Sequence, residues 1–166
     1  MKRLAENIDR LAEKDEDLLR RGRETTELRR AAAAQLHGVC VSFVGELNRL
    51  LARTEVRLDP ETFNLSQFEP EMPTLIQIQV RGRILQVAFT ATPELVSTEE
   101  FRIPYILEGS VRAFNQQLLD KDLIEEQLLF YTLEGRGNMW RYFDTRTYRS
   151  GPFDQEYLTG LMEEVI

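Results

Sequence analysis

The chain has 166 residues, which suits a single domain that buries roughly two-thirds of its unfolded surface. Its net charge of −7 at pH 7 argues against wholesale binding to nucleic acid or to an anionic membrane surface, because both attract basic proteins. The single cysteine, Cys40, excludes an intramolecular disulfide. Because the N-terminus is charged and no long apolar run follows, we expect a cytoplasmic protein without a membrane span.

Residues 1–24 are predicted to form a charged helical arm, and residues 25–166 a single α+β domain. The first thirty residues carry nine basic and eight acidic side chains, so this segment cannot be buried on all sides. Four apolar residues nevertheless follow a heptad spacing: Leu4, Ile8, Leu11 and Leu18. Asp15 interrupts the stripe, and Gly22 is a candidate hinge. Two interpretations stay open, a solvated helix and a short coiled coil that serves as a dimer arm.

The apolar pattern strengthens between Leu28 and about Ala52, where apolar residues recur at steps of three and four. This predicts an amphipathic helix with a stripe wide enough to pack on a sheet. His37 and Cys40 lie three residues apart in it and could offer two ligands to a metal ion. Zinc needs three or four protein ligands, and the chain has no other histidine or cysteine. We therefore interpret both as core or boundary residues and predict neither a metal nor a cofactor.

Residues 74–91 alternate between apolar and polar side chains on both sides of a turn at Arg81 and Gly82. Period two predicts two strands, and Gly82 can adopt the left-handed conformation that a tight hairpin turn needs. With those two residues as the loop, every apolar residue faces an apolar residue, as Ile78 faces Leu85. A slip by one residue would break this match, so the register is strongly specified.

Acidic connections at 59–73 and 92–100 flank this hairpin. After the second connection, alternating residues predict a third strand: Ile103, Tyr105 and Leu107. Pro104 lacks a backbone donor and would place that strand at a sheet edge or a bulge. We then predict a short helix from Val111 to about Asp120 with Ser110 as its N-cap, and a continued strand is the alternative.

Residues 128–133 and 139–143 are predicted to form a second hairpin around the loop 134–138. Both faces of this hairpin are apolar, which suits central strands. At the C-terminal end, Asp154 is a candidate N-cap for an amphipathic helix. One face of that helix is apolar and would cover the sheet: Tyr157, Leu158, Leu161, Met162, Val165 and Ile166.

Together these elements predict an α+β fold, with an antiparallel sheet of about five strands packed by a long N-terminal helix and a C-terminal helix. The predicted order is α-βββ-α-ββ-α. This order, with the low isoelectric point of about 4.9, resembles that of the small acidic chaperones of type III secretion. For function, the resemblance implies a chaperone-like module.

The segment 136–149 is the candidate for ligand binding. It holds four arginines against Asp144 alone, a net charge of +3, interleaved with aromatic residues. The candidate ligand-binding residues are Arg136, Trp140, Arg141, Arg146, Tyr148 and Arg149. Arginine beside aromatic rings can stack on bases or hold phosphate and carboxylate groups, so the ligand would be RNA or another anion. The competing interpretation is a pair of strands whose arginines stay in water and pair with acidic loops.

The sequence shows no catalytic signature. A catalytic triad would have to use His37, which lies in the helix needed for the core. The acids Asp120, Asp122, Glu125 and Glu126 could form a metal or acid-base site, but in an acidic protein such a cluster marks a solvated turn. We therefore expect a non-enzymatic protein-interaction or chaperone-like module. Its partner would be another protein or a second copy in a homodimer, without membrane binding.

Overall fold

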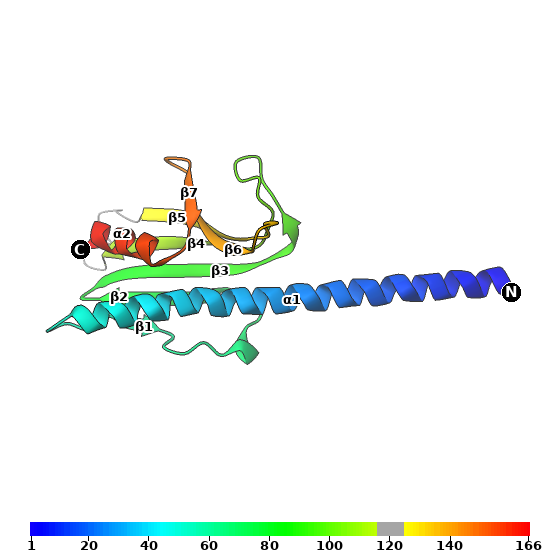
Figure 1. Cartoon of the computed structure of the whole chain (residues 1–166), viewed down its shortest axis with the longest axis horizontal. Coiled ribbons are helices and arrows are strands. Elements are labelled where there is room, and N and C mark those ends of the chain that lie inside the picture. The colour runs from blue at the N-terminus through cyan, green and yellow to red at the C-terminus, as the bar shows by residue number, and fades with distance from the viewer. Residues whose placement is uncertain (116–124) are drawn as a thin grey trace.

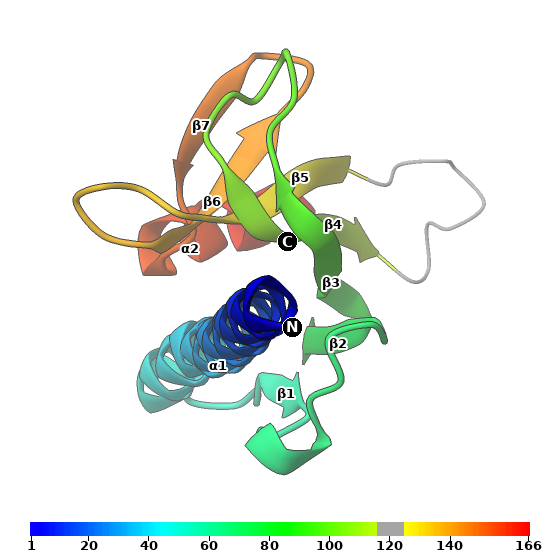
Figure 2. The same ribbon diagram turned by 90° about the vertical axis from the view of Figure 1, so that its right-hand side faces the viewer.

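The computed structural model describes residues 1–115 and 125–166. In these residues, seven antiparallel strands follow one another in chain order across a single sheet, which curves around the two helices (Figure 1, Figure 2). The helices are α1 (Lys2–Leu50) and α2 (Gln155–Val165), with a 3-10 turn, η1 (Leu65–Gln67). The strands are β1 (Arg57–Asp59), β2 (Thr74–Val80), β3 (Arg83–Val96), β4 (Tyr105–Asn115), β5 (Glu125–Thr132), β6 (Met139–Asp144) and β7 (Arg149–Pro152).

The predicted α+β class, with an antiparallel sheet between an N-terminal and a C-terminal helix, is confirmed. The predicted number of about five strands was too low, because the sheet also contains β1 and β7. β1 has only three residues, too few to show an alternating pattern. β7 contains Ser150, Gly151 and Pro152, which are poor strand formers, so nothing in its composition indicated a strand.

The first predicted hairpin is confirmed with its register. Ile78 pairs with Leu85 and Ile76 with Val87, and all four side chains are fully buried. The two loop residues have positive φ, 47° at Arg81 and 81° at Gly82, which is the geometry of a tight turn that matches the twist of its strands.

The predicted helix from Val111 to Asp120 is wrong over its first five residues, because residues 111–115 continue β4. Its remaining residues, 116–120, lie outside the described part of the chain. β4 pairs with β3 and β5, so both of its edges are hydrogen-bonded, and Val111 and Ala113 point into the core with period two. These pairings outweigh the local helical spacing. The described residues therefore contain no helix between the two hairpins.

Two further details of β4 differ from the prediction. Pro104 does not place the strand at an edge, because it precedes the first paired residue, Tyr105, and its carbonyl oxygen accepts a 2.8 Å hydrogen bond from the Leu133 amide. The alternative of a bulge agrees with the structure, since the pairing of β4 with β5 shifts register between Tyr105 and Leu107. Because residues 111–115 form a strand, Ser110 is not a helix cap. Ser110 lies within β4 and pairs with Ala88 of β3. The second predicted hairpin, β5 with β6, is confirmed.

The packed half of α1 supplies one side of the core. Its buried residues include Ala32, Ala33, Leu36, Cys40 and Phe43. His37 is also buried, and its Nε2 donates a 2.7 Å hydrogen bond to the Pro60 carbonyl oxygen. Burial raises the pKa of the Cys40 thiol to about 12. Both residues are therefore core residues, as expected.

The predicted C-terminal helix is confirmed as α2. Asp154 caps it, since its Oδ1 accepts a 2.9 Å hydrogen bond from the Tyr157 amide. Leu158, Leu161 and Met162 pack with α1 and the sheet in one core cluster. A second, smaller cluster lies around Phe101, Tyr105, Phe130 and Phe143.

Candidate functional site

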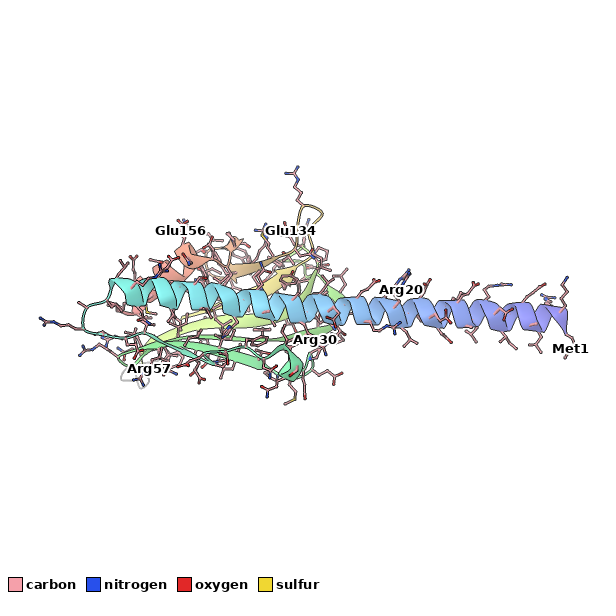
Figure 3. The ribbon with its side chains drawn as sticks, turned by 60° about the horizontal axis from the view of Figure 1, so that its bottom comes forward. Met1, Arg20, Arg30, Arg57, Glu134 and Glu156 are labelled. Atoms are coloured by element: carbon pink, nitrogen blue, oxygen red, sulfur yellow. The ribbon has the colours of Figure 1, made fainter. Side chains whose placement is uncertain are left out.

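The first half of α1 projects beyond the sheet as a single straight helix (Figure 1). We call residues 1–24 the arm; all of them are exposed, and Figure 3 shows side chains radiating from this stretch. At 1.5 Å per residue the arm is about 36 Å long. The helix continues through Gly22 without a break, so the structure shows no hinge there.

The arm carries an exposed apolar stripe. Its residues are between 56% and 65% exposed: Leu4, Ile8, Leu11 and Leu18. Leu19 adds to this stripe, because it follows Ile8 by about three turns and is 66% exposed. Leu19 does not fit a strict heptad, so the heptad spacing alone did not predict it as part of the stripe.

The stripe points in the same direction as the packed face of α1. Leu18 precedes Leu36 by eighteen residues, which is about five turns of an α-helix. Leu4 precedes Cys40 by thirty-six residues, about ten turns. Leu36 and Cys40 are fully buried against the sheet. The apolar face of α1 therefore continues past the end of the sheet, where no part of the described chain covers it.

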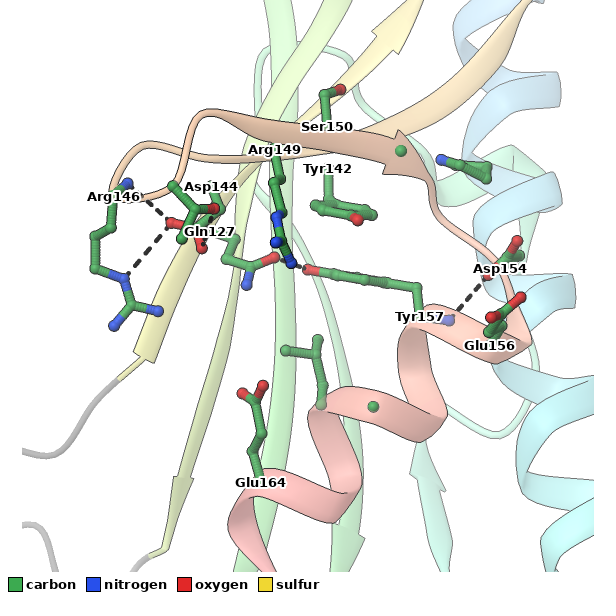
Figure 4. Close-up of a pocket in the computed structure, with 15 residues that line it drawn as sticks. Gln127, Tyr142, Asp144, Arg146, Arg149, Ser150, Asp154, Glu156, Tyr157 and Glu164 are labelled. Atoms are coloured by element: carbon green, nitrogen blue, oxygen red, sulfur yellow. Dashed lines mark hydrogen bonds and ion pairs between the residues drawn. The ribbon is translucent and has the colours of Figure 1, made fainter.

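A groove of about 710 Å³ lies between α2 and the β6–β7 hairpin, and we call it the α2 groove (Figure 4). The rings of Tyr142 and Tyr157 stack there with centroids 4.2 Å apart and planes at 8°. The Tyr157 hydroxyl donates a 2.8 Å hydrogen bond to Gln127 Oε1. Burial raises the pKa of Tyr157 well above its ordinary value, so this hydroxyl stays protonated and remains a donor.

The α2 groove is lined by charges of both signs. Arg146 and Arg149 face four acids: Asp144, Asp154, Glu156 and Glu164. Asp144 is engaged locally, since its Oδ1 lies 3.5 Å from Arg146 Nε and accepts a 2.9 Å hydrogen bond from the Arg146 amide. Arg149 extends from β7 toward the bond between Gln127 and Tyr157 (Figure 4). It forms no salt bridge with any side chain of residues 1–115 and 126–166.

The six candidate residues of segment 136–149 do not converge on one surface. Trp140 is buried in the core, 3% exposed, and its Nε1 donates to the Ala32 carbonyl oxygen. Arg141 donates two hydrogen bonds to the Glu134 carboxylate, of 2.6 Å and 3.2 Å. Arg136 is an exposed residue of the loop between β5 and β6.

The other three candidates lie around the β6–β7 turn. Arg146 and Arg149 line the α2 groove, as described. Tyr148 is exposed, with a positive φ of 56°, and contacts Phe143 edge-on at 6.2 Å between ring centroids. The structure thus brings Arg146 and Arg149 to one groove. Gln127 and Tyr157 could not be predicted as part of this site, because they come from distant parts of the chain and neither belongs to a motif.

The acidic cluster after β4 is only partly described. Asp120 and Asp122 lie outside the described residues, as does the side chain of Glu125. Glu126 forms a salt bridge of 3.1 Å with Arg112 across β4 and β5. In residues 1–115 and 126–166 no group of three or more histidine, cysteine, aspartate or glutamate side chains is arranged to hold a metal ion.

No family model, curated protein or solved structure matches this chain. The functional proposals therefore rest on the geometry described above. None of the helices in the described part of the chain combines the length and apolarity that crossing a membrane requires.

Proposed function

We propose that this chain is a non-enzymatic, chaperone-like protein-interaction module that pairs with a second copy of itself through the arm. One observation carries the proposal: the apolar stripe of the arm is exposed along its whole length and continues the face that packs on the sheet. An apolar stripe of this length on a rigid helix is what helix-helix association uses.

The geometry of the stripe favours a helical partner. It is narrow, with leucine and isoleucine mainly at heptad positions, and a narrow seam suits one facing helix rather than a sheet. A second copy brings a helix of the same length and the same seam. Its arm would lie against this one beyond the end of the sheet, where the stripe is uncovered.

The energetics fit a dimer of moderate affinity. Complete burial of a leucine or isoleucine side chain contributes roughly 1.5–3 kcal/mol. The four heptad residues of each copy are a little over half exposed, so the eight of them in a pair contribute somewhat more than half of eight such burials. Association costs on the order of 4–15 kcal/mol, so the balance is narrow and the dimer should depend on concentration. Asp15 within the seam weakens the pairing further and would limit its register.

Sedimentation velocity tests this proposal. The full chain should sediment as a dimer at high concentration and dissociate on dilution. A chain that begins at Thr25 keeps all the buried residues of α1, the first of which is Ala32, and should sediment as a monomer at every concentration. If both forms are monomers, the arm does not pair with itself.

A second candidate function is the binding of RNA or another anionic ligand in the α2 groove. The observation in its favour is that Arg146 and Arg149 both line the groove that contains the Tyr142–Tyr157 stack. Contacts to phosphate weaken as salt rises, so retention on single-stranded RNA should fall with ionic strength. Lack of retention at low salt would remove this candidate.

A further inference from the structure

A second groove, of about 660 Å³, lies on the sheet face that points away from α1 and α2; we call it the outer groove. Its position follows from the alternation of β5. Leu129 and Tyr131 pack in the cluster that contains the helices, whereas Leu128 and Phe130 belong to the other face and line the outer groove.

The outer groove is acidic. Four glutamates line it, Glu99, Glu100, Glu108 and Glu126, and no lysine, arginine or histidine does. Of these, Glu126 forms a salt bridge with Arg112 in which both side chains are 46% exposed. The other three form no salt bridge within the described residues. At least three carboxylates therefore face this groove without a basic partner from the described chain.

The floor of the groove is apolar. Phe101 stacks on Phe130 with ring centroids 4.5 Å apart, and the ring centroids of Tyr105 and Phe130 are 4.4 Å apart. These rings are nearly fully buried, and Leu128 beside them is partly exposed. Charges at the rim of such a floor are poorly screened on that side, which strengthens their attraction for a cation.

We propose that the outer groove binds a basic peptide segment of a partner protein. Arginine or lysine head groups would meet Glu99, Glu100 and Glu108, while their aliphatic stems lie on the apolar floor. The carboxylates are spread along the groove, and in the described residues they do not form a group able to hold a metal ion. Several cations spaced along a peptide fit this arrangement, and a nucleic acid is repelled by it.

Fluorescence anisotropy with a labelled peptide of alternating arginine and serine tests the proposal on the full chain. The test variant is Glu99→Gln/Glu100→Gln/Glu108→Gln. The matched control is Glu61→Gln/Glu69→Gln/Glu71→Gln, which changes the net charge equally at exposed residues of the connection between β1 and β2. We expect the groove variant to raise the Kd at least about tenfold and the control to raise it less than about twofold.

Three results would overturn the proposal. The first is equal weakening by both triple variants, which would show a general attraction to an acidic protein. The second is no binding of the peptide to the wild-type chain at low ionic strength. The third concerns Ser110→Lys, which places a cation in the groove and serves if the triple groove variant does not fold. Unchanged peptide binding by this folded variant would exclude the groove. None of these results depends on whether the arm forms a dimer.

Discussion

The indole Nε1 of Trp140 in β6 donates a 2.7 Å hydrogen bond to the main-chain carbonyl oxygen of Ala32 in α1. This contact joins the sheet to the helix near the point where the packed half of α1 gives way to the arm. Arg29, one turn earlier, adds hydrogen bonds from its guanidinium to the carbonyl oxygens of Thr92 and Ile106. These contacts fix α1 to the sheet just after the arm ends.

Replacing Trp140 with phenylalanine should destabilise the protein by about 2–3 kcal/mol. The substitution removes the hydrogen bond to Ala32 and leaves a void beside Phe89, whose ring centroid lies 5.0 Å from that of Trp140. Urea unfolding followed by circular dichroism measures the change. The control is Tyr148→Phe at an exposed ring, which should leave the midpoint within error. Equal midpoints for all three proteins would show that the contact contributes nothing.

Replacing Gly82 with valine should cost about 1–2 kcal/mol, because a β-branched residue resists the φ of 81° that this turn requires. The comparison is Gly38→Ala in the packed half of α1. A Cβ there meets nothing within 4 Å, and alanine favours the helix, so this variant should gain about 0.5–1 kcal/mol. Thermal melts of both variants should therefore shift in opposite directions, and a Gly82 variant that melts like wild type would contradict the turn.

Replacing Gly109 with alanine should cost about 2–3 kcal/mol or more. A Cβ at this position would lie 2.0 Å from the Ala88 carbonyl oxygen and 2.7 Å from Phe89 Cα, so β3 and β4 would have to separate. Ser110→Ala, at the next residue of the same strand, should change the free energy of unfolding by no more than about 0.5 kcal/mol. Denaturant midpoints of the two variants provide the measurement. Similar midpoints would mean that the strands accommodate a side chain.

The pair of Glu134 and Arg141 should make stability depend on pH. The hydrogen bond from Arg141 lowers the pKa of Glu134 below its ordinary value of 4.5, against the opposing effect of burial. Because the folded-state pKa is the lower one, the ionised carboxylate stabilises the fold above pH 4.5. That contribution is lost as the pH falls through the folded-state pKa.

Glu134→Gln tests this dependence. The variant should be less stable than wild type by about 1 kcal/mol at neutral pH, and the difference should shrink as the pH falls below 4.5. Urea titrations across the acid range measure it. Glu61→Gln, an exposed glutamate without a salt bridge in the described residues, should match wild type throughout. A constant difference between Glu134→Gln and wild type at every pH would exclude the ionic contribution.

Two charges in the stripe should dissociate the proposed dimer without unfolding the chain. Leu11→Asp/Leu18→Asp places carboxylates in the apolar seam and should shift the full chain to a monomer, with at least about a hundredfold weaker association. Arg10→Gln/Arg20→Gln changes the net charge by the same amount away from the stripe and should remain dimeric. Analytical ultracentrifugation distinguishes them. If both double variants keep the oligomeric state of wild type, the stripe is not the interface.

Both hairpins could be predicted because their information is local. Between Ile76 and Val87 the alternation leaves one register in which apolar residues face each other, and Gly82 marks the turn between them. The cap of α2 is local too, since Asp154 binds an amide three residues later. The apolar stripe of the arm could also be predicted, from the spacing of its leucines and its isoleucine. That spacing did not indicate whether another part of the chain covers the stripe.

Other features depended on contacts with neighbouring strands and on packing rather than on the local spacing of residues. Residues 111–115 carry a helical spacing but became a strand because β3 and β5 offered hydrogen bonds on both sides. β7 forms by backbone pairing with β6, from Asp144 opposite Arg149 to Arg141 opposite Pro152, although its own residues favour no strand. Trp140 and Arg141 are neighbours in sequence, yet alternation sends the first into the core and the second to the Glu134 carboxylate.

The two grooves could not be predicted from local patterns in the sequence. Tyr142 and Tyr157 stack only because the chain turns back after β7 and places α2 on the sheet, where Tyr157 meets Tyr142 of β6. Glu99, Glu108 and Glu126 share the outer groove only because the loop after β3 folds over the strands β4 and β5. The alternation of apolar and polar residues and the capping of helices involve residues a few positions apart. The amino-acid sequence alone was therefore enough to predict them. A binding surface requires side chains from separate elements to meet, and that depends on the packing of the whole chain.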